Sequence, residues 1–130
     1  MGIGLDIVAT ERIARSLAHD GDAFAERVFT AAELRECRDR ADRAQALGAR
    51  FAAKEACFKA LGTGWTKGLS FLQVEVRGLE SGQPELQLSG AAAERAQALG
   101  VRRIHVSLTH EAEAAAAVVV LEGGAVSPGD

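Results

Sequence analysis

One stretch decides the fold: it runs from Gly48 to Gly64 and reads GARFAAKEACFKALGTG. Alanine, leucine, lysine, glutamate and arginine dominate it, and these residues have high helix propensity. Gly62 stands where a left-handed C-terminal cap is expected, and Gly64 follows in the next turn. The stretch therefore predicts a helix that ends in a glycine-containing loop.

Apolar side chains, large on one arc and small on another, cover almost the whole circumference of this helix, which indicates burial. A narrow sector holds Gly48, Glu55 and Lys59, of which the last two lie four residues apart and so share one face. The two charges are either an ordinary ion pair on a solvated strip or groups aimed at a specific target. Arg50 and Lys54 fall beside or within the apolar arc, so we expect each to find a partner or to reach water along its stem.

The composition indicates one water-soluble domain, since 48% of the 130 residues are hydrophobic and 25% are charged. The sequence contains no long apolar run and no signal-peptide pattern at its start, so we expect a cytoplasmic protein with no membrane span. The formal net charge of -3 argues against binding nucleic acid. The two cysteines form no Cys-x-x-Cys pair and give no zinc or redox signature. We expect residues 1–122 to form a single domain and residues 123–130 a disordered tail.

The first residues predict a strand over 2–9, with Ile3, Leu5 and Ile7 on one face and Gly2, Gly4, Asp6 and Val8 on the inner face. Aspartate is depleted in strands, and such departures from local propensity often mark functional sites. Asp6 is therefore a candidate functional residue, although it could instead accept hydrogen bonds from a nearby turn or helix end.

The remaining elements alternate between helical and strand patterns. Helices are expected after a Thr10 cap, over 24–29, over about 30–40 with a Thr30–Glu33 capping box, from Asp42, and over 89–99. Strands are expected over 71–77, 85–88, 101–109 and 114–121, the last apolar on both faces and therefore central. The fold class is α+β, with an antiparallel sheet and helices packed against one side.

Two carboxylates in apolar settings, Asp6 and Glu55, point to a hard cation such as Mg²⁺, which usually takes one or two carboxylates and fills its octahedron with water and phosphate oxygens. Lys59, one turn from Glu55, would then provide a point charge for a phosphate. Arg50, Lys54 and His105 are further candidates for anionic groups. This set of residues is typical of phosphoryl transfer.

Three blocks resemble a known family: GIGLDIV with ERI at residues 2–8 and 11–13, RFAAKEA with KALGTG at 50–56 and 59–64, and IHVSLTH at 104–110. Weaker matches are residues 27–34, 69–71 and 82–84. In this order they resemble the small, bacterial-type 4'-phosphopantetheinyl transferases, the holo-acyl-carrier-protein synthases. The departures are Trp65 in the loop, where the family usually has a smaller residue, and Cys57 with Phe58 before Lys59.

The resemblance implies that coenzyme A donates its phosphopantetheine arm to a serine of apo acyl carrier protein, for fatty acid or polyketide synthesis, and leaves adenosine 3',5'-bisphosphate. It implies catalytic roles for Asp6, Glu55 and Lys59: Asp6 and Glu55 bind Mg²⁺, Glu55 also activates the serine, and Lys59 lies at the diphosphate. Arg50 and His105 match positions near the 3'-phosphate of coenzyme A, and Gly82 and Pro84 match a hairpin beside the adenine. The further residues expected to contact coenzyme A are Lys54, Gly62, Thr63, Gly64 and Ser107.

The resemblance also implies a homotrimer with sites at subunit interfaces, so that His105 can serve a neighbouring site. Arg12 matches a basic residue that meets the acidic carrier protein, and Arg15 can extend that basic patch. Simpler interpretations remain open: His105 as a sheet histidine with internal partners, Arg50 as the partner of an acidic neighbour, and His110 as a turn residue. Two other functions also remain open, a Mg²⁺-dependent hydrolase of a nucleotide diphosphate and a non-catalytic oligomeric binding module.

Overall fold

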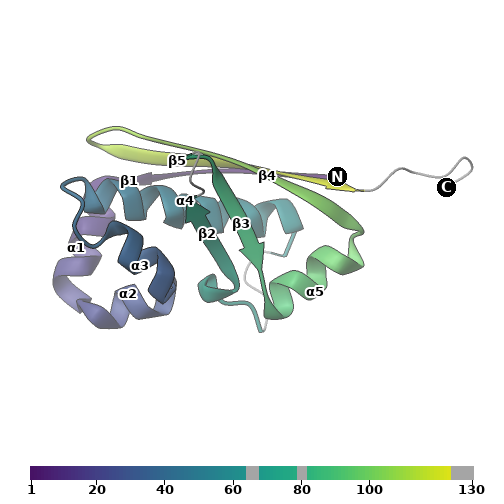
Figure 1. Ribbon diagram of the computed structural model, residues 1–130, viewed down its shortest axis with the longest axis horizontal. Helices are drawn as coiled ribbons and strands as arrows, with labels where there is room; N and C mark the ends of the chain where they lie inside the picture. Colours follow the sequence, from purple (N-terminus) through teal and green to yellow (C-terminus); the bar gives the residue numbers. More distant parts are fainter. Residues whose placement is uncertain (64–67, 79–81, 124–130) are drawn as a thin grey trace, which may run out of the picture.

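The structure, a computed structural model, describes residues 1–63, 68–78 and 82–123 (Figure 1). Its elements are, in order, β1 (Gly2–Ala9), α1 (Thr10–Asp20), α2 (Asp22–Val28), α3 (Ala31–Cys37), α4 (Arg43–Leu61), the 3-10 helix η1 (Phe71–Gln73), β2 (Val74–Gly78), β3 (Pro84–Leu88), α5 (Gly90–Ala98), β4 (Val101–His110) and β5 (Ala114–Gly123). Strands β1, β5 and β4 form an antiparallel sheet in that order, and β2 pairs with β3 in a separate hairpin. The α+β class is confirmed, and the strands divide between two sheets.

Helix α4 forms the centre of the core and lies along the inner face of the three-stranded sheet (Figure 1). Its other sides meet α1, α3, the β2–β3 hairpin and α5. The buried residues of α4 come from the whole circumference, as the sequence pattern predicts. Strand β5 is central and pairs with β1 on one side and β4 on the other, which confirms the expectation from its apolar run.

Strand β1 crosses α4 at very close range, and two glycines make this possible. A Cβ atom on Gly2 would lie 2.3 Å from the carbonyl oxygen of Ala60, and one on Gly4 would lie 1.8 Å from the carbonyl oxygen of Ala56. Only glycine permits such backbone-to-backbone contact. The glycines therefore bring the following residue of that strand face, Asp6, to the edge of α4.

Several predicted boundaries are confirmed. Thr30 and Glu33 form a capping box at the start of α3. Gly62 caps α4 in the left-handed region with φ +70°. The predicted Thr10 cap is wrong: Thr10 is the first residue of α1, Ala9 is the N-cap, and no side-chain hydrogen bond caps this end. The backbone N–H of Thr10 instead donates to Glu113 O at 2.9 Å, where β1 still meets the sheet.

Residues 71–73 differ from the prediction, because the expected strand begins only at Val74. The hydroxyl oxygen of Ser70 accepts a hydrogen bond from Leu72 N, and Ser70 O accepts one from Gln73 N, which together stabilise a 3-10 turn. Gly64, Trp65 and residues 124–130 lie outside the described residues. Across the described part of the chain, none of the helices combines the length and apolar character needed to cross a bilayer.

Candidate active site

Three of the expected catalytic residues meet at the edge between β1 and α4. Lys59 Nζ donates to Asp6 Oδ1 at 3.0 Å and to the backbone oxygen of Leu5 at 3.0 Å. The Asp6 side chain is only 16% exposed, whereas that of Lys59 is 55% exposed. Glu55, one turn before Lys59 on α4, is half-buried beside them. Asp6 and Lys59, 53 residues apart in the sequence, are therefore neighbours, and they face solvent only in part.

The electrostatics of this cluster show that the Asp6 carboxylate affects Glu55. The pKa of Glu55 is raised, first because burial disfavours its charged form and second because the Asp6 carboxylate is nearby. The cations of Lys59 and Arg12 oppose this shift. The Arg12 guanidinium lies 5.6 Å from the centre of the Phe51 ring, which holds it on the side of α4 that faces α1.

Asp6 and Glu55 could hold a divalent cation that needs few protein ligands. No group of three or more His, Cys, Asp or Glu side chains suited to a metal occurs within the described residues. Two carboxylates fit Mg²⁺, whose remaining ligands are usually water and substrate phosphate oxygens. The unfavourable proximity of the two carboxylates is the kind of charge arrangement that a cation would relieve.

A groove of about 580 Å³ adjoins Glu55 between α1, α2 and η1. Its apolar walls come mainly from Phe24, Phe51 and Phe71, and Arg12 and Arg27 add positive charge. Such a groove can accept an elongated group that is apolar in part and negatively charged in part. Arg15 lies nearby on α1, exposed, and donates to Glu11 Oε1 at 2.7 Å.

A second cavity, of about 440 Å³, lies on another side of α4 and is lined by Arg50, Gly82 and Pro84. Arg50 Nη2 pairs with Glu36 Oε2 at 2.8 Å, which agrees with the simpler interpretation that Arg50 has an acidic partner. The other lining residues include Arg40, Arg77 and His110. Since basic groups dominate the polar part of this lining, the cavity suits an anionic ligand.

The structure separates His105 from this cavity and brings His110 into it. His105 and Ser107 lie on the outer face of the sheet, opposite Val120 and Val118, and His105 Nε2 is 3.2 Å from Glu122 Oε1. His110 is the last residue of β4, shares the inner face with Ile104, and lies 3.7 Å from Asp42 Oδ2. The alternation of side chains along β4, if extended to residue 110, places His110 on the inner face, and this sequence signal could have identified it.

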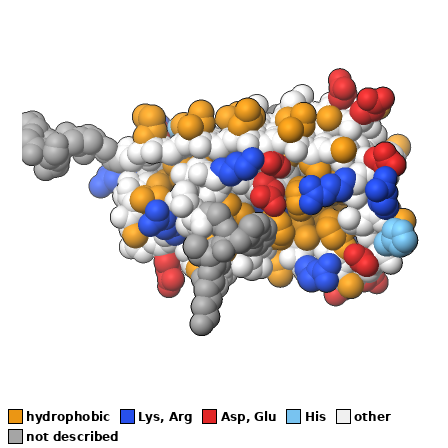
Figure 2. Space-filling model, turned by 180° about the vertical axis from the view of Figure 1, so that it is seen from behind, with side chains coloured by type: hydrophobic (Ala, Val, Ile, Leu, Met, Phe, Trp, Pro, Cys, Tyr) orange, Lys and Arg blue, Asp and Glu red, His pale blue; other side chains and the backbone are white. Residues whose placement is uncertain are grey.

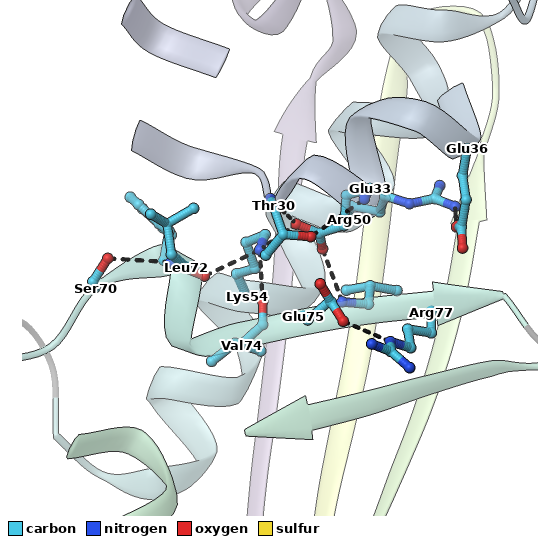
Figure 3. A network of polar contacts seen from close by, with 12 residues as sticks. Thr30, Glu33, Glu36, Arg50, Lys54, Ser70, Leu72, Val74, Glu75 and Arg77 are labelled. Atoms are coloured by element: carbon cyan, nitrogen blue, oxygen red, sulfur yellow. Dashed lines mark hydrogen bonds and ion pairs between the residues drawn. The ribbon is translucent and has the colours of Figure 1, made fainter. Parts of the chain in front are cut away.

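Lys54 has no surface toward either the groove or the cavity, because its side chain is fully buried. Its ammonium group donates to Phe71 O at 3.0 Å and to Val74 O at 2.6 Å, and it lies 2.8 Å from Glu33 Oε1 (Figure 3). Burial lowers the pKa of Lys54, and the Glu33 carboxylate opposes that shift. Its three N–H donors are thus used inside the protein, so the expected contact with coenzyme A is not available to Lys54.

The end of α4 carries the remaining expected contacts. Gly62 follows the helix, and the Thr63 hydroxyl donates to Phe58 O at 3.3 Å. This turn keeps Lys59 in the last turn of α4, where its charge also complements the carbonyl end of the helix. Gly64 lies outside the described residues, so the structure describes only the first part of the expected glycine loop.

Comparisons with known proteins identify the family of the chain. Residues 2–119 match the 4'-phosphopantetheinyl transferase superfamily. The holo-[acyl-carrier-protein] synthase of Maridesulfovibrio salexigens is 48% identical over 122 residues, which cover 94% of this chain and 98% of that protein. The corresponding enzyme of Methylobacterium radiotolerans is 48% identical over 131 residues, covering 98% and 96%.

Solved structures give the same result. The Helicobacter pylori holo-[acyl-carrier-protein] synthase in complex with coenzyme A has a TM-score of 0.81 at 33% identity, and the match covers 92% of this chain and 99% of that one. The enzyme of Bacillus anthracis, in complex with CoA (3',5'-ADP), has a TM-score of 0.77 at 38% identity, with coverage of 95% and 96%. The chain therefore belongs to the 4'-phosphopantetheinyl transferase superfamily.

Proposed function

We propose that this protein is a holo-[acyl-carrier-protein] synthase, which transfers the 4'-phosphopantetheine group of coenzyme A to a serine of apo acyl carrier protein. The relatives that bear this name match nearly the whole chain at 48% identity. The observation that carries the proposal is the meeting of Asp6, Glu55 and Lys59 at one partly exposed edge. Two carboxylates beside a lysine suit the diphosphate of coenzyme A, where catalysis depends on positioning and charge neutralisation.

In the proposed reaction the serine oxygen of the carrier attacks the β-phosphorus of the coenzyme A diphosphate. A P–O bond breaks, and adenosine 3',5'-bisphosphate leaves as the anion. Glu55, one turn before Lys59 on α4, is placed to accept the proton of the attacking serine. Lys59 stabilises the charge that develops on the diphosphate oxygens. A Mg²⁺ ion held by Asp6 and Glu55 would supply further positive charge to the same oxygens.

The adenosine end of coenzyme A is proposed to bind in the cavity lined by Arg50, Gly82 and Pro84. Arg50 suits the 3'-phosphate, because a guanidinium can donate two parallel hydrogen bonds to phosphate oxygens. His110 lines the same cavity, so it fits the role at the 3'-phosphate better than His105, which contacts Glu122 on the outer sheet face.

The carrier protein is proposed to dock over the groove beside Glu55. Arg12 and Arg27 would meet acidic side chains of the carrier, and the phenylalanine walls would meet its apolar residues. Arg15 is exposed on the same helix as Arg12 and would extend the basic surface. The chain has a net charge of -3, so this local patch is needed to attract an acidic partner.

A homotrimer with active sites between subunits is also proposed. The β1 part of the outer sheet face is apolar, and Ile3, Leu5 and Ile7 on it are 66% to 70% exposed, which is unusual for large apolar side chains. Figure 2 shows a row of hydrophobic side chains along the edge where Figure 1 has this sheet. An apolar hollow on this face is lined by Leu5, Asp6, Ile7, Lys59 and Ala116, so a second copy seated there would touch the catalytic edge.

The positions of Arg50 and Glu55 support the same assembly. They lie five residues apart, roughly 140° around α4, and line different hollows. Co-expression of an Arg50→Ala chain with a Glu55→Ala chain tests whether one site uses both subunits. With shared sites, random mixing restores about a quarter of wild-type activity, because that fraction of interfaces has both native residues. Sites contained within one subunit would give no recovery.

The transfer itself is tested by mass spectrometry. The protein is mixed with coenzyme A, Mg²⁺ and an apo carrier from fatty acid or from polyketide synthesis. Transfer adds about 340 Da to the carrier, the mass of one phosphopantetheine arm, and the Glu55→Ala variant serves as the inactive control. Release of free phosphopantetheine without carrier modification would instead indicate a hydrolase. Absence of any reaction, with no change of thermal stability on adding coenzyme A, would reject both enzyme functions.

A further inference from the structure

Arg50 is unusual among the basic residues of the second cavity because it is almost completely buried, with 8% of its surface exposed. Its Nη1 donates to Ala46 O at 3.3 Å, and its Nη2 pairs with Glu36 Oε2 at 2.8 Å. Its Nε has no hydrogen-bond partner within the described residues. Arg50 and its carboxylate partner Glu36 both line the cavity of about 440 Å³, so an anion that enters the cavity competes with Glu36 for the same guanidinium.

Glu36 already occupies part of the place where such an anion would bind. Its carboxylate lines the cavity with Arg50 and lies near Gly78 at the end of β2. If Gly78 carried a side chain, its Cβ atom would lie 3.8 Å from Glu36 Oε2. The Glu36 side chain is 36% exposed, so it can leave Arg50 and be solvated by water. In the ligand-free protein it therefore fills the role of an internal anion.

Glu33, on the same helix, is a carboxylate that cannot leave its partners, and it serves as a comparison for Glu36. Its side chain has no exposed surface, and its two oxygens accept hydrogen bonds from Thr30 N and Val76 N, both at 2.8 Å. It also pairs with Lys54 (Figure 3). Glu33 cannot leave without breaking several contacts, whereas Glu36 lies at the outer end of α3 and has solvent on one side.

The other cations of the cavity also have carboxylate partners. Arg40 donates to both oxygens of Asp42, at 2.7 and 2.9 Å, and His110 lies 3.7 Å from the same carboxylate. Arg77 Nε donates to Glu75 Oε1 at 2.6 Å. An entering phosphate therefore meets no free cation among these described residues, and it must compete with carboxylates of the protein.

We propose that Glu36 is a specificity-determining residue that competes with the 3'-phosphate of coenzyme A for Arg50. The inference rests on the proposed function and adds the regulation of affinity at that site. A ligand with a 3'-phosphate must displace Glu36, and the return of Glu36 to Arg50 helps the product, which carries the same phosphate, to leave. A ligand without this phosphate leaves the Glu36–Arg50 pair in place. Glu36 thus limits affinity for one part of the ligand only.

The test compares coenzyme A with 3'-dephospho-coenzyme A, which differ only in that phosphate, by calorimetric titration of the whole protein. Glu36→Gln keeps the size of the side chain and removes its charge. We expect it to lower the Kd of coenzyme A about tenfold, within the usual range for two ligands coupled at one site, and to leave that of dephospho-coenzyme A within twofold. Inhibition by adenosine 3',5'-bisphosphate should strengthen by a similar factor.

Controls separate this effect from general charge. Glu94→Gln on α5 makes the same change of net charge at an exposed position that does not line the cavity, and it should leave both Kd values unchanged. Glu36→Ala should act in the same direction as Glu36→Gln, which guards against a folding defect of one variant. An unchanged Kd of coenzyme A, or an equal change for both ligands, would overturn the inference. A wild-type protein that binds coenzyme A and transfers nothing would reject the proposed function and leave the role of Glu36 measurable.

Discussion

Replacement of Gly4 by alanine is the most direct test of how β1 positions Asp6 beside α4. The added Cβ would lie 1.8 Å from Ala56 O, 2.8 Å from Ala56 C and 2.9 Å from Ala60 N. These neighbours are the backbone of α4 and cannot turn aside as a side chain can. The strand and the helix must therefore separate by roughly 1 Å or more, which disrupts the close-packed core on both sides of the contact.

Two quantities should change together in the Gly4→Ala variant. Overpacking of a core by one methyl group usually costs about 1–3 kcal/mol, and we expect about 3 kcal/mol because the obstacle is rigid. In a chain of this size such a loss lowers Tm by about 10 °C. Asp6, two residues further along β1, moves away from Lys59 and Glu55, and a displacement of that size can reduce kcat/KM about a hundredfold.

Gly48→Ala is a matched control within the same interface. A Cβ atom there would lie 3.4 Å from Ala115 Cβ and 3.7 Å from Ile13 Cγ1, which are ordinary contact distances. Since Gly48 lies inside α4, alanine should stabilise the helix by up to about 1 kcal/mol and leave transfer unchanged. Thermal denaturation and the carrier mass-shift assay measure both variants. If Gly4→Ala kept the wild-type Tm, or if Gly48→Ala were equally damaging, our account of the β1–α4 contact would be refuted.

Three other changes test separate parts of the structure. Lys54→Met should lose about 3–5 kcal/mol of unfolding free energy in chemical denaturation, because Glu33 would stay buried without its cation, and adding Glu33→Gln should restore only part of this loss. Lys59→Ala should reduce kcat/KM about a hundredfold and change stability by less than about 1 kcal/mol, since its pair with Asp6 is largely exposed on the lysine side; a large loss of stability would contradict this. The pKa of Glu55 is raised, so with a chelator present the wild type should lose stability relative to Glu55→Gln as the pH rises above about 4.5 and through the folded-state pKa. If the difference in unfolding free energy between the two proteins were the same at pH 4 and pH 7, the shift would be excluded.

The sequence singles out Asp6, Glu55 and Lys59 because each of them has a local signal. The glycines of β1 and the aspartate that follows them are unusual for a strand, and Glu55 with Lys59 are rare charges on an otherwise apolar helix. These local signals do not show how close β1 and α4 lie to each other. The close contact of Gly4 with α4 explains why the strand can carry Asp6 to Lys59, and it depends on tertiary packing.

The partners of the buried charges could not be predicted, because they come from distant elements. The apolar arc of α4 indicates that Arg50 and Lys54 need partners, but Glu33 and Glu36 belong to a helix whose position is fixed only by the fold. The same reason applies to Phe71. Its alternation with neighbouring residues fits a strand, whereas in the structure its carbonyl accepts a hydrogen bond from Lys54 and its segment forms a 3-10 turn.

Lys54 also shows why a buried charge can be retained where an apolar side chain would often be more stable. A buried ion pair can usually be replaced by two apolar residues of similar volume without loss, because both partners are side chains. Two of the acceptors of Lys54 are the backbone carbonyls of Phe71 and Val74, which no substitution can remove. An apolar residue at position 54 would take the ammonium donor away from both carbonyls inside the core, and Phe71 O would keep the hydrogen bond from Val74 N. The lysine therefore fixes η1, whose Phe71 lines the groove. Through its ion pair with Glu33 it also fixes α3, the helix that carries Glu36. One internal ammonium group thus holds the walls of both proposed ligand sites against α4.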